Sequence, residues 1–113
     1  MENEFENKMV EAAMAVIVSA GEARDRCKEA LQSARAGKFG EAEAKLKEAK
    51  ENITEAHNGQ TEVIQAEMRG EETQISLLFI HAQDTIMTIT SEINMAEEML
   101  EMYKLIYKKG ELV

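Results

Sequence analysis

Three side chains that can take part in chemistry fall within four positions of one stretch, residues 77–88: His81, Gln83 and Asp84. Histidine is the side chain whose charge and nucleophilicity change near neutral pH. A ring nitrogen can also accept a group covalently and pass it on. The stretch lies inside a long apolar-periodic segment, so two interpretations compete: a nucleophile, or a polar residue tolerated in a packed helix.

Other routes to chemistry are poorly represented in the sequence. No His-x-x-x-His or Cys/His spacing predicts a transition-metal site, and no Glu-x-x-His pair predicts a di-metal bundle. No serine or cysteine is paired with a base at a recognisable spacing, and no glycine-rich phosphate loop is present. Cys27 lies in an apolar stripe and is predicted to be a buried packing thiol. With these sites excluded, the chemistry left for His81 is to accept a group covalently on its imidazole and pass it on.

Composition predicts a single all-α domain over residues 1–113. The chain is 44% hydrophobic, is dominated by helix-favouring alanine, methionine and glutamate, and contains no proline to break a long helix.

A net charge of −9 argues against nucleic acid and against an anionic membrane surface as partners. A lone cysteine excludes an internal disulfide, and no apolar run is long enough to span a membrane. The acidic start lacks the basic region of a secretory signal. We therefore expect a cytoplasmic protein without membrane insertion.

The spacing of apolar residues predicts an antiparallel three-helix bundle with helices at about 4–36, 40–68 and 74–109. Glycines mark the first turn at Gly37 and Gly40, and Gly110 is expected to end the third helix. Predicted core positions in the first two helices are Phe5, Met9, Ala12, Val16, Ala20, Ala23, Cys27, Ala30 and Ala34, then Phe39, Ala42, Leu46, Ala49, Ile53, Ala56, Gln60 and Val63. Those in the third are Ile75, Phe79, Ala82, Ile86, Ile89, Ile93, Ala96, Leu100, Tyr103 and Tyr107. Thr73 or Ser76 is a candidate cap for its start.

The third helix carries a second set of residues, mostly large and apolar, on another face: Leu77, Ile80, Asp84, Met87, Met95, Met99, Met102 and Ile106. A bundle of this size buries only one face of each helix, so the second face must meet something else. Another copy of the chain is the first interpretation, because closed homo-oligomers dominate. A methionine-rich groove for a different partner is the alternative. His81 falls between the two faces.

Two further groups of polar residues accompany His81. If Asp84 met its symmetry mates at an axis, the carboxylates would repel, and a hard cation such as Mg²⁺ would relieve the repulsion. Thr88 lies two turns from His81, almost in line with it. In the second helix, Gln60 occupies a stripe position with His57 beside it. His57 is either a surface residue near a polar layer or a neighbour of the site, and the sequence leaves both open.

These motifs resemble the lactose/cellobiose-type enzyme IIA of the bacterial phosphoenolpyruvate-dependent sugar phosphotransferase system. The resemblance covers nearly the whole chain. It includes the alanine-rich first helix, the turn Ala36-Gly37-Lys38-Phe39, Ala56-His57-x-x-Gln60-Thr61, and the signature His81-Ala82-Gln83-Asp84-x-x-Met87-Thr88. One departure is Thr85, where relatives often carry a bulkier residue.

The resemblance implies a homotrimer of three-helix subunits that assembles through the third helix. It implies that His81 accepts a phosphoryl group from HPr and gives it to a cysteine of enzyme IIB, for uptake of a cellobiose-, chitobiose- or lactose-type disaccharide. Asp84 corresponds to an aspartate associated with a metal ion on the threefold axis, here expected to be one Mg²⁺ per trimer. Gln83 is a candidate to orient the imidazole or the phosphate oxygens, and His57, Gln60 and Thr88 are candidate site neighbours.

Two other functions fit parts of the sequence. A histidine phosphotransfer domain of two-component signalling also presents a histidine from a helix bundle, but that family has Lys-Gly closely after the histidine, where this chain has Asp84-Thr85. A non-catalytic helical interaction module would leave His81 as a satisfied polar residue at an oligomer contact.

Overall fold

Three long helices make up the described part of the chain. The computed structural model describes residues 4–69 and 77–112, in which α1 spans Glu4–Arg35, α2 spans Phe39–Met68 and α3 spans Leu77–Leu112. Within these ranges no strand is present, which confirms the predicted all-helical, three-helix fold. Without proline, nothing interrupts the backbone hydrogen bonds of any helix. The predicted start of the third helix at residue 74 and its candidate caps lie outside the described residues.

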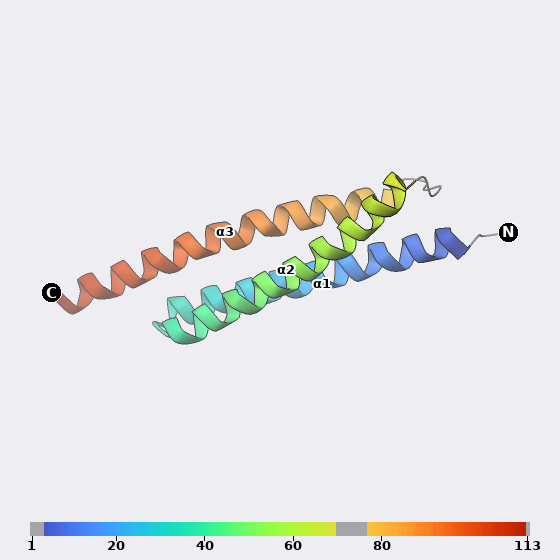
Figure 1. Cartoon of the computed structure of the whole chain (residues 1–113). Coiled ribbons are helices and arrows are strands. Elements are labelled where there is room, and N and C mark those ends of the chain that lie inside the picture. The colour runs from blue at the N-terminus through green and yellow to red at the C-terminus, as the bar shows by residue number, and fades with distance from the viewer. Residues whose placement is uncertain (1–3, 70–76, 113) are drawn as a thin grey trace.

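The helices form an elongated bundle of 69 × 20 × 18 Å. In Figure 1, α1 and α3 run in the same direction, and α2 runs in the opposite direction. The turn between α1 and α2 therefore lies at the same end as the C-terminal part of α3. The start of α3, which carries His81, lies at the opposite end, beside the N-terminal half of α1.

One continuous apolar core joins the three helices, and its members are Ala13, Val16, Ala20, Ala23, Cys27, Ala30, Ala34, Ala42, Leu46, Ala49, Ala56, Ala82, Ile86, Ile89, Ile93, Ala96 and Leu100. Nearly all were predicted from spacing. The exception is in α1, where Ala13 joins this core and Ala12 instead packs against a smaller cluster of Val63 and Phe79. The predicted stripe was one residue off there, because adjacent alanines at 12 and 13 give apolar spacing no means of choosing between them. Phe5, Met9 and Ile75 lie outside the described side chains.

Alanines are five of the seven buried hydrophobic residues of the described part of α1, and their small side chains let the other helices approach closely. At Gly59 of α2, an added Cβ would lie 3.2 Å from Cγ2 of Val16 on α1. Sequence alone assigns Gly59 only a weakened helix, whereas the structure shows that the glycine allows close packing there.

The end of α1 is closed by a Schellman motif centred on Gly37. The amide of Lys38 donates to the carbonyl of Ser33 at 2.8 Å, and the amide of Gly37 donates to the carbonyl of Ala34 at 3.0 Å. Gly37 has φ of 79°, a conformation that only glycine adopts at little energetic cost. The predicted turn is thereby confirmed, and its geometry explains the requirement for glycine.

Tyr107 fastens the far end of α3 to this turn. Its hydroxyl donates to the carbonyl of Arg35 at 2.7 Å, and its ring meets that of Phe39 edge-on, with centroids 5.3 Å apart. Tyr107 was predicted as a core residue but is exposed, because it reaches over the turn instead of into the bundle. The prediction that Gly110 ends α3 was wrong: the helix continues to Leu112, since glycine without a left-handed turn merely weakens a helix.

Replacing Gly37 with alanine is expected to lower the free energy of unfolding by about 1–2 kcal/mol or more, because an L-residue is strained at positive φ. The new Cβ would also lie 2.7 Å from Cε1 of Tyr107. Gly21→Ala is the matched control: nothing lies within 4 Å of its added Cβ, so helix propensity alone should stabilise the protein by about 0.5–1 kcal/mol. Urea titration measures both, and equal stability of Gly37→Ala and the parent would contradict the account.

Candidate functional site

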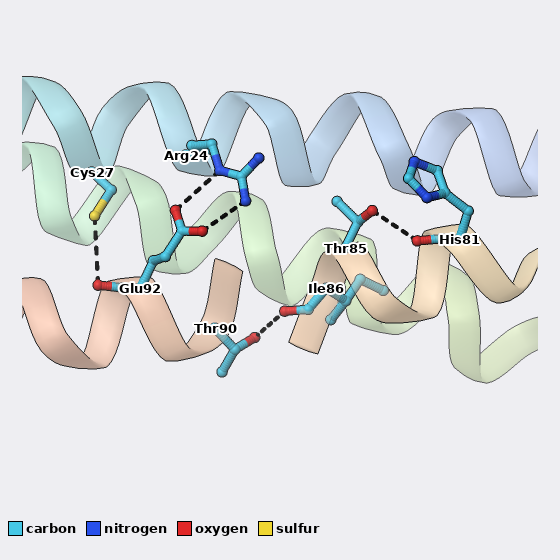
Figure 2. Close-up of polar contacts among 7 residues, drawn as sticks. All are labelled: Arg24, Cys27, His81, Thr85, Ile86, Thr90 and Glu92. Carbon is cyan, nitrogen blue, oxygen red and sulfur yellow. Dashed lines mark hydrogen bonds and ion pairs between the residues drawn. The ribbon is translucent and has the colours of Figure 1, made fainter. Parts of the chain in front are cut away.

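His81 lies about one turn into α3, on an exposed flank. Its ring points from α3 toward the N-terminal half of α1 (Figure 2). The hydroxyl of Thr85 donates to the main-chain carbonyl of His81 at 2.7 Å, so this contact involves the backbone and leaves the ring unoccupied. Among the described residues, none forms a hydrogen bond with the imidazole. A rigid helix thus presents a solvent-accessible ring nitrogen.

The register between α1 and α3 shows which part of α1 faces His81. Arg24 bonds to Glu92, 68 positions later, and Ala12 packs against the cluster containing Phe79, 67 positions later. Because the two helices run in parallel, the same offset places His81 level with Ala13. His81 is therefore flanked by the first half of α1.

Arg24 and Glu92 form the ion pair that fixes this register (Figure 2). Nε of Arg24 lies 3.0 Å from Oε1 of Glu92, and Nη2 lies 2.7 Å from Oε2, a bidentate geometry. The hydrogen bond from Arg24 lowers the pKa of the Glu92 carboxyl, against the opposing effect of burial, and the same bond raises the pKa of Arg24. Sequence reasoning missed this pair, since nothing local links residues 68 positions apart.

Cys27 is buried beside the pair, with Sγ 3.8 Å from the carbonyl oxygen of Glu92. Burial raises the pKa of the thiol, and the negative charge of Glu92 raises it further. A thiol held protonated is a poor nucleophile. The prediction of a packing cysteine is confirmed.

Asp84 lies on the next flank of α3, in the second apolar face that the sequence predicted. Ile80 and Met87 stand on either side of it, and the exposed apolar residues of α3 are Leu77, Ile80, Met87, Met95, Met99, Met102, Leu105, Ile106 and Tyr107. Leu77 and Met87 are 82% and 71% exposed, so this face is unpaired in a single chain. Gln83 is half-buried, and Thr88 is exposed on the same flank as His81.

A single chain supplies no ready metal site in the part that the structure describes. No three His, Cys, Asp or Glu side chains come together there as possible ligands. Asp84 alone offers one exposed carboxylate, which is too few protein oxygens to hold a hard cation firmly. A cation at Asp84 would therefore require further copies of the chain.

His57 lies elsewhere within one chain. The ion pairs Lys50–Glu97 and Lys104–Glu43 set the register between the antiparallel helices α2 and α3. The same register places His57 level with Thr90, about 13 Å along α3 from His81 at 1.5 Å per residue. It also lies on the side of α2 that faces α3, whereas His81 faces α1. One subunit thus does not bring the two histidines together, and Gln60, half-buried in α2, stays with His57.

The comparisons with known proteins agree with this architecture. Residues 11–104 match the family described as "PTS system, Lactose/Cellobiose specific IIA subunit". The chain is 38% identical over 97 residues to the lichenan-specific phosphotransferase enzyme IIA component of Bacillus subtilis, a match that covers 86% of this chain and 88% of the relative. The crystal structure of the cellobiose-specific enzyme IIA from Bacillus anthracis superposes with a TM-score of 0.85 at 42% identity, covering 96% of each chain.

A third neighbour is the IIA(Chitobiose) protein of the Escherichia coli phosphotransferase system, solved in complex with HPr. It has a TM-score of 0.78 at 28% identity, covering 94% of this chain and 99% of that one. This chain belongs to the lactose/cellobiose-specific IIA family of sugar phosphotransferase systems. It is accordingly a phosphotransferase component in sugar transport. In the described part of the chain, none of the helices has the length and apolarity needed to cross a membrane.

The Arg24–Glu92 pair predicts a pH dependence of stability. Because the pKa of Glu92 is lower in the folded state, its contribution is present above the unfolded value, near 4.5, and is lost as pH falls through the folded pKa. Glu92→Gln should lower stability modestly at pH 7 and flatten the loss of stability below about pH 4.5. Urea titrations of both proteins from pH 3 to 7 measure this. Parallel stability curves for the two proteins would show that the pair contributes nothing.

Proposed function

We propose that the chain is a cytoplasmic phosphoryl carrier in which His81 accepts a phosphoryl group from phospho-HPr and passes it to a cysteine of enzyme IIB. The imported sugar would be a disaccharide of the cellobiose, chitobiose or lactose type. The observation that carries this proposal is the exposed His81 imidazole, held on a rigid helix with no hydrogen bond from the described residues. The naming of HPr in the complex of the related chitobiose protein supports HPr as the donor.

The proposed chemistry needs little beyond positioning. A ring nitrogen of His81 attacks phosphorus, and the bond between phosphorus and the donor's leaving group breaks with its electron pair. In the second step the enzyme IIB thiolate attacks the same phosphorus, and the phosphorus–nitrogen bond breaks to restore the imidazole. Transfers of this kind depend on in-line geometry and on stabilising negative charge. Gln83 remains a candidate to orient the ring or the phosphate oxygens, but two positions along a helix turn it to the opposite side of α3 from His81, so it would have to act from a second subunit.

The proposed assembly is a homotrimer built on α3. Support comes from its long exposed apolar face, which a soluble single chain rarely leaves uncovered. The His81 ring points toward α1 (Figure 2), whereas helix geometry turns Asp84 and Met87 away from α1, so a trimer formed through Asp84 and Met87 would leave room for a partner at the histidine.

Asp84 fits a role as the metal residue of such a trimer. It is the carboxylate within an otherwise apolar stretch of this face, between Ile80 and Met87. Three copies at an axis would gather carboxylate oxygens, the ligands that Mg²⁺ prefers, and burying them without a counter-ion would be unfavourable. The ion would neutralise these charges. Under this proposal Asp84 acts in assembly, His57 and Gln60 are neighbours that a second subunit would have to bring closer, and Thr88 already shares the flank of α3 that carries His81.

Incubation with phosphoenolpyruvate, enzyme I and HPr should add one acid-labile phosphate per chain, because His81 is the accessible nucleophile. Intact-mass analysis measures the gain. His81→Gln should abolish it and His57→Gln should retain it, which makes the second histidine the matched control. Absence of phosphate on the parent with active donors, or its retention in His81→Gln, would refute the proposal.

Light scattering at micromolar concentration should give the mass of three chains, because the apolar face of α3 is otherwise exposed. Elemental analysis of the parent should find about one Mg²⁺ per trimer. Asp84→Leu should lose the metal and remain trimeric, with stability equal to or above that of the metal-free parent, since an apolar side chain removes the buried charges. A stable monomeric parent would rule out the assembly, and a metal-free parent would rule out the ion alone.

A further inference from the structure

Thr85 lies one turn after His81 on α3, and residues four positions apart are neighbours on the surface of a helix. Figure 2 shows the Thr85 hydroxyl directed back toward His81, with the ring of His81 on the same side of α3. Thr85 is half-buried, whereas His81 is exposed. A hydroxyl group therefore stands beside the candidate nucleophile.

The proton of this hydroxyl is already in use. Thr85 donates it to the main-chain carbonyl of His81, with 2.7 Å between the two oxygens. The same carbonyl also accepts the backbone N–H of Thr85, as the carbonyl four positions earlier does throughout an α-helix. Both lone pairs of the carbonyl are then occupied. Oγ1 of Thr85 can accept a hydrogen bond from the imidazole, but it has no proton left to donate to it.

Covalent geometry keeps Oγ1 within reach of the ring. The carbonyl to which Thr85 is bonded belongs to His81 itself, and Nδ1 is the ring nitrogen that is closer to the main chain. Rotation of the His81 side chain between its staggered rotamers brings Nδ1 toward Oγ1. The ring makes no such bond in this structure, and hydrogen bonds of catalytic groups often tighten only when the substrate arrives.

Other acceptors are scarce on the side of His81 that faces α1. The register places His81 level with Ala13, and residues 12–18 of α1 carry only apolar side chains. The main-chain carbonyls of α1 are engaged in its own helical hydrogen bonds. Helix geometry turns Asp84 away from α1. Among these groups, Oγ1 of Thr85 is the acceptor that a ring directed toward α1 can use.

We propose that Thr85 is a positioning residue, which holds the neutral imidazole of His81 with its proton on Nδ1 and its free lone pair on Nε2. The inference rests on the proposed function of His81. The hydrogen bond made by one ring nitrogen determines which tautomer is present and so which nitrogen can react. Nε2 attacks phosphorus, the leaving group of the donor departs with the electron pair of the broken bond, and Nδ1 keeps its proton. The phosphorylated ring is then positively charged, and Oγ1 stabilises that charge by accepting from Nδ1–H.

The tautomer is measured on the unphosphorylated protein by ¹⁵N NMR at about pH 8, where imidazole is neutral. His81 of the parent should carry its proton on Nδ1. A ring without a partner keeps the preference of free histidine for the Nε2–H form, so Thr85→Val should shift His81 toward that form. Thr85→Ser keeps the hydroxyl and should retain the tautomer of the parent. Thr90→Val is the matched control, because it removes the same type of bond, from Thr90 to the carbonyl of Ile86 at 2.7 Å.

The rate of phosphorylation should follow the tautomer. Thr85→Val should lower the second-order rate constant about two- to tenfold, the size expected for one hydrogen bond. The decrease should be similar with phospho-HPr and with phosphoramidate, a small donor, because both react at the same nitrogen. Thr85→Ser and Thr90→Val should react at close to the parent rate.

The remaining outcomes separate this role from the proposed function. A parent with the His81 proton on Nε2, or a Thr85→Val protein with the tautomer of the parent, would overturn the role of Thr85. Equal losses of rate in Thr85→Val and Thr90→Val would overturn it as well, since the hydroxyls would then act only on the helix. A parent with the Nδ1–H tautomer that accepts phosphate from neither donor would reject the function of His81, which is a different failure.

Discussion

A helix has one circumference, and α3 must divide it among three surfaces. Phe79, Ala82 and Ile86 face the core, Met87 and Met95 face away, and His81 lies on the flank between core and solvent that faces α1. Because side chains on a helix are fixed in angle by their sequence positions, no surface can widen without narrowing another. The spacing of residues along α3 therefore determines both how the bundle packs and where its chemistry is accessible.

The angular position of a side chain around α3 determines its surroundings only if α3 is held in a fixed register against α1. The described core contains no buried polar or charged side chain, so apolar contacts alone would let long, alanine-lined helices slide with little loss of energy. Arg24 and Glu92 supply directional contacts at the edge of that core, and Tyr107 supplies another at the far end of α3. Pairs of this kind contribute modestly to stability, but they discriminate between registers. The position of His81 relative to α1 follows from them.

Sequence periodicity predicted the core of all three helices because the spacing of apolar residues directly reflects the buried face of a helix. It failed where neighbouring residues were equivalent, as at Ala12 and Ala13, or where a side chain left its stripe for a tertiary contact, as at Tyr107. It identified His81 as a candidate nucleophile from residue type and the exclusion of other sites, and the family resemblance supplied the transferred group. It could not find Arg24–Glu92 or separate His57 from His81, because both depend on the register between helices.

The uncharged first half of α1 was visible in the sequence but had no evident meaning there. Its buried members, Ala13, Val16 and Ala20, account for core packing, and a sequence reader assigns the remaining apolar residues to the same cause. Only exposure separates Val10, Met14 and Val18 from them. A net charge of −9 makes the contrast sharper, since an acidic protein gains solubility from charge on every free surface. Exposed surface kept free of charge in so acidic a chain is therefore not explained by the packing of the bundle alone.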